Sequence, residues 1–592
     1  MPDTNTERWR DRSPFALLTR HFFSRFFDSE FLSPGGEASV SVTQILALLP
    51  VPGAVLSLYY IFMKYAFLVA HLRSWAAVDS WSDRCFFVSI SMIVTGLVTL
   101  LYWDNLFPDG KDYLNLVPLP IKLSTLFLAK VSSLVLFMGM FSVMINAASG
   151  ILFPLAATIS YASSADSMRF LAAHFVAVFS GSGFVFLLLV GVQGACMTIL
   201  PRRLFNRVSV AIQSSLLVVF LSSFLVLSDL IVSVRNSHNP LYQVLFLPAW
   251  FTALYDHVLG IIPRHATSVS WRYPLLALMI AFALSVLFYS LSYRRYVGRC
   301  QQASTDDQTR SGLAGRFLSI VRKLITKEPE QSAAFDFVAA TLSRSARHRM
   351  VLGSCLGVAL AFCLAAVFLL VARFGEATLY RLSLTGLCIP PMLYFFLLGG
   401  VRLAFTLPSE LSANWVFRTS AFRPAVYWTG VRAALLTLIV TPVFCFSLLL
   451  FASLWGWSTG WRVSLLELMS GIMLMERLFL TCRKVPFACA YLPGAGDLKL
   501  RWPVYLFASA AYLFATAGLG LVLATRPWAY GGALVVGLLA IRHLATRRQT
   551  LLRTSLPIFE EQPHTDVLTL FSGLPGTFLE QGRATEPTLT QG

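Results

Sequence analysis

The chain has 592 residues, of which 56% are hydrophobic and 13% are charged, and its formal net charge is +18. A soluble globular domain carries about 25% charged residues, so this composition excludes an ordinary soluble protein. The apolar residues gather in runs long enough to cross a hydrocarbon core about 30 Å thick, where only a helix or a closed barrel satisfies the backbone. No short alternating segments typical of a barrel are present, so we expect an all-α polytopic membrane protein.

The apolar runs predict twelve transmembrane helices in two sets of six. The expected spans lie near 44–70, 85–103, 125–148, 170–200, 208–234 and 274–292, and then near 350–372, 382–402, 431–456, 461–482, 503–524 and 527–545. The run 241–262 is also apolar, but it contains Pro248 and Asp256. We therefore expect that run to be an interfacial or re-entrant piece, since a charged residue within a span is costly.

Five segments follow from this pattern. Residues 14–32 and 333–348 mix phenylalanines with basic residues, which is typical of helices that lie in the membrane surface. The predicted segments are an N-terminal part with a surface helix (1–41), a first six-span half (42–292), a basic linker with a surface helix (293–349), a second six-span half (350–545) and a C-terminal tail (546–592).

The distribution of Lys and Arg predicts the orientation. Most of the 47 basic residues fall in loops on one side of the twelve-span layout, and this side is expected to be cytoplasmic. Both termini and the 293–349 linker would then be cytoplasmic, and we expect the chain in the inner membrane of a bacterial cell. Basic loops facing anionic lipid account for the net charge, so no nucleic-acid partner is expected.

The order of features indicates an internal duplication. Segments 103–130 and 407–434 each join the second and third spans of their half, and each has an acidic residue after a proline, then apolar residues, then a proline and a basic residue. Because each set has an even number of spans, the two copies would be parallel repeats.

The chain lacks the common catalytic and ligand-binding motifs. There is no GxxxxGK[ST] loop, HExxH pair or EF-hand loop, the GSGF stretch at 181–184 lacks the phosphate-binding lysine, and none of the nine cysteines has CxxC spacing. We therefore expect no catalytic residue, no metal and no cofactor in this chain. A membrane-embedded transferase with an unfamiliar motif stays open.

Ionisable residues within spans are candidates for function because their burial in lipid is costly. We expect Asp229 to pair with Arg235 near an interface, and Glu476, beside Arg477, to pair with neighbouring helices. A proton-coupled carrier would need a chain of such groups at mid-depth, and this set is small. The candidates are Asp229, Glu467 and Glu476.

The two loops that join the second and third spans are candidates for contact with a partner. They are short, amphipathic and rich in proline and aromatic residues, so they either lie on the membrane or dock into a cytoplasmic protein. The candidates are Asp109, Lys111, Asp112, Leu116, Pro118 and Pro120 in the first loop, and Glu410, Trp415 and Arg418 in the second.

A surface helix, six spans and a short helical loop after the second span together resemble the type-two permeases of ATP-binding-cassette (ABC) exporters. The stretch LFPDGKDYLNLVPLPIKLSTLFLAK carries the resemblance, with Asp112, Leu116, Leu119–Pro120 and Lys122 at the matching positions. The second loop departs from this pattern, because it lacks the Leu-Pro before its basic residue. The resemblance implies that these loops contact P-loop ATPase subunits, which would supply ATP from a separate chain.

Three hypotheses follow. The leading one is an ABC transporter permease with two fused six-span halves, and the apolar bundle favours export of a lipophilic or amphipathic compound. The second is a secondary active carrier, which requires essential charges at mid-depth. The third is a membrane-embedded lipid or glycan transferase, which requires a cluster of acidic and basic residues at one membrane face.

Overall fold

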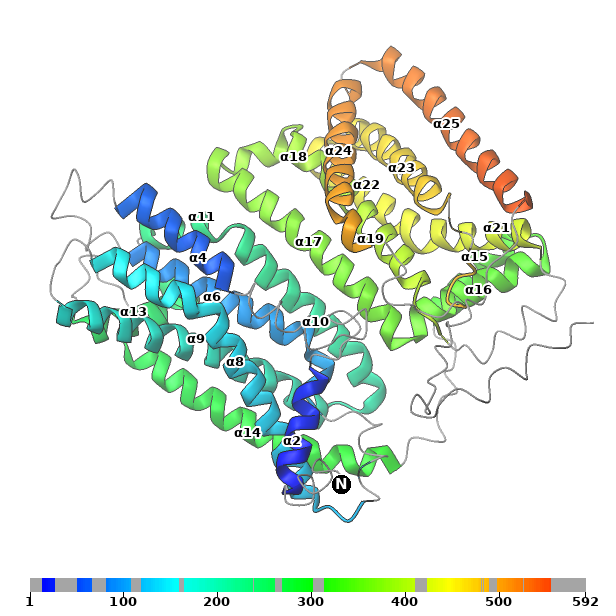
Figure 1. Ribbon diagram of the computed structural model, residues 1–592. Helices are drawn as coiled ribbons and strands as arrows, with labels where there is room; N and C mark the ends of the chain where they lie inside the picture. The colour runs from blue at the N-terminus through cyan, green and yellow to red at the C-terminus, as the bar shows by residue number, and fades with distance from the viewer. Residues whose placement is uncertain are drawn as a thin grey trace, which may run out of the picture.

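A computed structural model defines the fold of most of the chain (Figure 1). It describes residues 13–26, 50–65, 81–107, 116, 119–158, 164–237, 239–260, 269–301, 313–409, 423–480, 482, 484–488, 498–524 and 526–554.

Every element of this described part is a helix. In chain order they are α2 (Pro14–Arg25), α4 (Pro50–Tyr59), the π-helix η1 (Tyr60–Tyr65), α6 (Trp81–Leu101), the 3₁₀-helix η2 (Trp103–Asn105), α8 (Leu123–Thr158), α9 (Ser164–Ile199), α10 (Arg202–Leu225), α11 (Leu227–Asn236), α12 (Pro240–Leu245), α13 (Leu247–Leu259), α14 (Arg272–Gln301), α15 (Leu313–Ile325), α16 (Pro329–Arg344), α17 (Ala346–Phe374), the 3₁₀-helix η3 (Glu376–Tyr380), α18 (Leu384–Leu387), α19 (Ile389–Phe405), α21 (Pro424–Leu435), the π-helix η5 (Leu436–Val440), α22 (Thr441–Trp455), α23 (Trp457–Phe479), α24 (Leu498–Ala524) and α25 (Pro527–Thr554).

Ten helical segments are long and apolar enough to cross a membrane within the described residues. This confirms the prediction of an all-α, multi-pass membrane protein. The segments are Trp81–Leu101, Ser124–Thr158, Asp166–Ile199, Val208–Leu225, Arg272–Ser292, Arg347–Phe374, Leu384–Phe405, Pro424–Trp455, Phe507–Ala524 and Trp528–Arg553.

The remaining two predicted spans are not among these ten. Of the predicted span at 44–70, the structure describes residues 50–65, which form α4 and η1. The predicted span at 461–482 corresponds to α23, a helix of 23 residues. Its apolar character is reduced by the charged residues Arg462, Glu467, Glu476 and Arg477.

The run at 241–262 forms two short helices, α12 and α13, of 6 and 13 residues. A 13-residue helix is about 20 Å long, which is too short to cross the hydrocarbon core. The Asp256 side chain on α13 lies 2.7 Å from the Arg84 guanidinium on α6, and both are buried. This ion pair explains how an acidic residue is accommodated in the apolar run, and it fixes α13 against α6.

Four helix pairs of the first half have counterparts in the second half, whereas the first spans differ, since α4 packs on α8 and α17 packs on α19. α2 lies on α8 and α16 lies on α21; α6 packs on α9 and α19 packs on α23. α8 also packs on α9 as α22 packs on α23, and the last helices α14 and α25 pack on α9 and α23. Each half has its own large apolar core, one centred on α8 and α9 and the other on α19, α21 and α23.

The main contact between the halves, among the described residues, joins α10 to α17, which lie side by side in the centre of Figure 1. Gly353 and Gly357 are one turn apart on α17 and face α10. A Cβ added at Gly353 would lie 2.6 Å from Ser214 Oγ, and one added at Gly357 would lie 3.2 Å from the Ser214 carbonyl oxygen. These glycines therefore allow the two backbones to approach closely, as small residues do in membrane helix pairs.

Candidate functional site

The predicted coupling loops lie mostly outside the described residues. Of the nine loop candidates, only Leu116 and Pro120 are described; Asp109, Lys111, Asp112, Pro118, Glu410, Trp415 and Arg418 are not. Pro120 is exposed. Leu116 is half-buried and packs, with Ile121, against a small cluster formed by Leu18 and Phe22 of α2 and by Leu126 and Ala129 of α8. The end of the first loop therefore touches the N-terminal surface helix.

The second loop ends on the other surface helix. Arg423, the last residue before α21, donates from Nη2 to Glu328 Oε2 at 2.7 Å and from Nε to Glu330 Oε1 at 3.1 Å. Both carboxylates lie at the start of α16. The hydrogen bond to Glu330 raises the pKa of the exposed Arg423 guanidinium above its ordinary value, so this cation stays charged. In both halves, then, the flank of the loop contacts the helix that precedes the first span of that half.

Asp229 joins the two halves. Its Oδ1 lies 3.7 Å from Arg373 Nη2 at the end of α17, and the predicted pairing with Arg235 is wrong. Residues six apart on a helix point about 120° away from each other, whereas neighbouring positions are three or four apart, so this spacing does not favour the pair. Arg235 instead donates to Ser82 Oγ at 3.3 Å.

Glu476 is the centre of a buried ionic network. Its side chain is fully buried and accepts hydrogen bonds from Arg432 on α21 and from Arg548 on α25, the latter at 3.4 Å. The Arg548 guanidinium also lies over the Trp428 ring, 4.8 Å from its centroid. The neighbouring Arg477 is exposed. The network therefore fastens the last helix to the second half, which is a structural role.

Glu467 has a different environment. It is 2% exposed, and its carboxylate accepts a hydrogen bond from Ser470 Oγ at 3.4 Å. Ser470 Oγ in turn lies 3.3 Å from the Tyr512 hydroxyl on α24. No cation lies within ion-pair distance of Glu467 in the part of the chain that the structure describes. A buried carboxyl group without a counter-ion is a candidate for proton binding.

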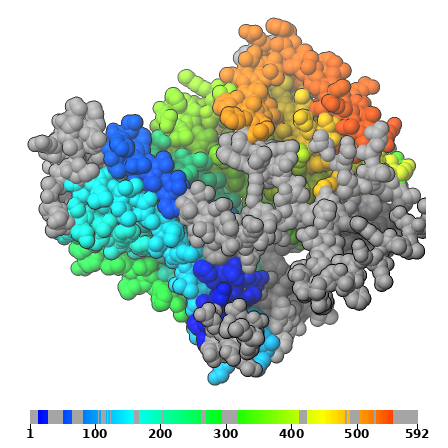
Figure 2. Space-filling model, viewed as in Figure 1, coloured from blue at the N-terminus to red at the C-terminus, as the bar shows by residue number. Residues whose placement is uncertain are grey.

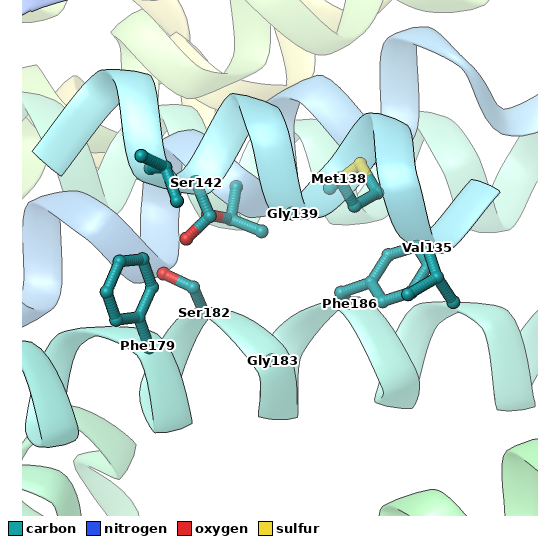
Figure 3. Close-up of a pocket in the computed structure, with 10 residues that line it drawn as sticks. Val135, Met138, Gly139, Ser142, Phe179, Ser182, Gly183 and Phe186 are labelled. Atoms are coloured by element: carbon teal, nitrogen blue, oxygen red, sulfur yellow. The ribbon is translucent and has the colours of Figure 1, made fainter. Parts of the chain in front are cut away.

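A pocket of about 410 Å³ lies between α8 and α9, with one side formed by α6 (Figure 3). Its walls are mostly apolar, and the Ser142 and Ser182 hydroxyls point into the space between the two helices. The volume is within the range of small-molecule sites, roughly 300–1,000 Å³. The lining residues are Thr95, Val135, Met138, Gly139, Ser142, Val143, Phe179, Ser182, Gly183 and Phe186.

A polar network supports the inner wall of this pocket. Ser91 Oγ on α6 lies 2.7 Å from Ser182 Oγ on α9, and Asn146 Nδ2 on α8 donates to Ser91 Oγ at 2.9 Å. The same amide nitrogen donates to the Ser142 carbonyl oxygen at 2.8 Å. These bonds join three spanning helices at one depth, so they hold the pocket walls in a fixed relation.

This pocket was not predicted from the sequence. The GSGF stretch contributes Ser182 and Gly183, and it was considered only as a phosphate-binding loop. A better signal is the recurrence of small and hydroxyl residues at mid-span, Gly139 and Ser142 on one helix and Ser182 and Gly183 on the next. Small residues in a span permit close backbone approach or leave space for a ligand.

Comparisons with known proteins find no relative: no family model, no curated protein and no solved structure matches this chain. The described residues also contain no group of three or more histidine, cysteine or acidic side chains that could hold a metal ion.

Proposed function

We propose that this chain is the permease of an ATP-driven transporter of the ABC type, built from two parallel six-span repeats. The support for two repeats is that four contacts of the first half, α2–α8, α6–α9, α8–α9 and α14–α9, have counterparts in the second half, α16–α21, α19–α23, α22–α23 and α25–α23. The α4–η1 segment and α23 complete the twelve spans in this proposal. Both termini and the 293–349 linker face the cytoplasm, and the membrane is the inner membrane of a bacterial cell.

The observation that carries the proposal is the repeated contact between a surface helix and the loop after the second span. In the first half Leu116 packs against Leu18 and Phe22, and in the second half Arg423 pairs with Glu328 and Glu330. Each surface helix also lies on the third span. A partner that pushes on either loop would therefore move a helix that is already packed on the transmembrane bundle, which is what a separate P-loop ATPase requires.

The test first looks for a P-loop ATPase encoded in a reading frame adjacent to this gene, and then measures its binding to the purified chain in nanodiscs. Asp112→Arg reverses a loop charge, and we expect an affinity about thirtyfold weaker, as for loss of a central interface contact. Glu376→Arg, an exposed site on η3 that is expected on the opposite membrane face, is the matched control and should bind normally. The chain alone should not hydrolyse ATP. Transport that persists without any ATPase would refute the proposal.

Glu467 favours a second candidate, the secondary carrier. A buried carboxyl group that lacks a cation can bind and release a proton during a transport cycle. This candidate predicts that substrate uptake or export follows the proton gradient and needs no ATPase. The third alternative, a membrane-embedded lipid or glycan transferase, gains no specific support from the described residues.

A further inference from the structure

The α8–α9 pocket lies at mid-depth and opens sideways. Gly139 and Ser142 are near the middle of the 124–158 span, and Ser182 and Gly183 are near the middle of the 166–199 span. Val135, Gly139 and Val143 at its edge are exposed on the surface of the first half. Figure 2 shows α8, in cyan, on the outer surface of that half. A molecule could therefore enter from the hydrocarbon core of the membrane rather than from water.

Two hydroxyl groups of the pocket have no hydrogen-bond partner among the described residues. Thr95 Oγ1 and Ser142 Oγ are buried, at 1% and 8% residue exposure, and neither bonds to any described group. Hydroxyls in helices commonly bond back to the carbonyl oxygen three or four residues earlier, as Thr99 and Ser180 do here. An unsatisfied buried hydroxyl is costly, and Thr95 and Ser142 both line the pocket. Their free hydrogen-bonding capacity is therefore available to a bound molecule.

The chemistry of the walls restricts that molecule. Among the described residues that line the pocket, none is ionisable, and the larger ones are Met138, Phe179 and Phe186. A charged group placed there would lose its hydration without gaining a counter-ion. The apolar part of a bound molecule would exchange its contacts with lipid for contacts with these side chains. One uncharged polar group on the same molecule would form hydrogen bonds with the Thr95 and Ser142 hydroxyls.

We infer that this pocket binds an uncharged amphipathic molecule of the lipid type, with a long apolar part and a hydroxyl or carbonyl group directed at Thr95 and Ser142. The interpretation of this molecule as the transported substrate rests on the proposed permease function. The binding itself does not depend on it, because it needs neither ATP nor a partner.

The experiment uses the full chain in nanodiscs with a hexadecanol analogue that carries a photoactivatable diazirine in mid-chain. A Cβ added at Gly139 or Gly183 meets no atom within 4 Å, so Gly139→Leu and Gly183→Leu should fill the pocket without disturbing the helices. We expect each to reduce labelling of the α8 and α9 peptides at least fivefold. Gly518→Leu on α24, which also has open space, is the matched control and should leave the labelling unchanged.

A second pair of measurements tests the hydroxyls. Thr95→Val keeps the shape of the side chain, and we expect it to weaken labelling by the alcohol several-fold while labelling by the matching diazirine alkane stays the same. Equal losses for alcohol and alkane would overturn the assigned role of the hydroxyl. Equal labelling of Gly139→Leu and Gly518→Leu, or labelling spread evenly over all spans, would overturn the site. Either failure leaves the ATPase-binding test of the permease proposal unaffected, and a negative ATPase test leaves the labelling result standing.

Discussion

The hydroxyl oxygens of Ser91 and Ser182 lie 2.7 Å apart, although 91 positions separate these residues in the chain. Their contact joins α6 to α9, and Asn146 extends it to α8. Three helices of the first half are thus connected by polar groups within an otherwise apolar core. Because such groups have few other partners in a membrane interior, they also fix the rotation of each helix about its own axis.

The first prediction concerns this contact. Ser91→Ala and Ser182→Ala should each destabilise the chain slightly, and the double variant should lose less than the sum of the two. The coupling energy should be about 0.6 kcal/mol, the average for hydrogen bonds between membrane helices. Unfolding in mixed micelles by a denaturing detergent gives the four free energies. Strict additivity of the two losses would show that the hydroxyls do not interact.

The second prediction concerns the Glu476 network. Glu476→Gln removes the charge that compensates the buried Arg548, and breaking one partner of a buried pair costs about 3–5 kcal/mol. We expect the chain to lose monodispersity at a clearly lower temperature in fluorescence-detected size-exclusion chromatography.

Arg477→Gln is the matched control for that variant, since it changes the adjacent but exposed residue. It should behave as the unmodified chain does. If both variants melt at the same temperature as the unmodified chain, then Arg548 has another means of stabilisation and the assigned structural role is wrong.

The third prediction separates the two transport hypotheses at Glu467. Glu467→Gln keeps the size of the side chain and removes its charge. For an ATP-driven permease we expect transport within about twofold of normal, because the energy enters through the cytoplasmic loops, and we expect equal or higher stability since an unpaired buried carboxylate is costly. Complete loss of transport by a correctly inserted variant would favour the proton-coupled carrier.

The fourth prediction concerns topology. In a cysteine-free background, Thr305→Cys and Pro575→Cys should resist an impermeant maleimide in intact cells and react after permeabilisation, because basic segments stay cytoplasmic. Glu376→Cys, in the loop between α17 and α19, should react in intact cells. Labelling of position 305 or 575 from outside would overturn the twelve-span layout with both termini in the cytoplasm.

Hydropathy predicted the spans because a long apolar run has few other stable forms. The run 241–262, which was expected to be an interfacial or re-entrant piece, forms the short helices α12 and α13, and α13 is stopped by Gly260 in the left-handed conformation. The amphipathic helix α15 was not predicted. Its apolar positions, such as Ile320 and Leu324, alternate with basic residues within a segment that resembles a linker.

The candidate sites were harder to predict than the spans. Glu467 and Glu476 are both acidic residues within one predicted span, so the sequence does not distinguish them. Their environments differ because the packing of α25 places Arg548, 72 positions away in the chain, next to Glu476. No ionisable residue of the described part of the chain lines the pocket, so the search for charged residues within spans does not find it. Its glycine, serine and threonine residues are common in spans and do not by themselves indicate a site. Its two unpartnered hydroxyls are recognisable only once the neighbouring helices are in place.

The α10–α17 contact holds the two halves together through a complementary surface and not only through the covalent linker. Gly353 and Gly357 make the two halves fit by shape, so halves expressed as separate chains would still recognise each other. The covalent connection adds a high local concentration, which favours pairing of the two halves within one chain over pairing between chains. The first half contains the hydroxyl-lined pocket and the second contains the buried ionic network, a difference that two identical chains in a symmetric dimer could not show.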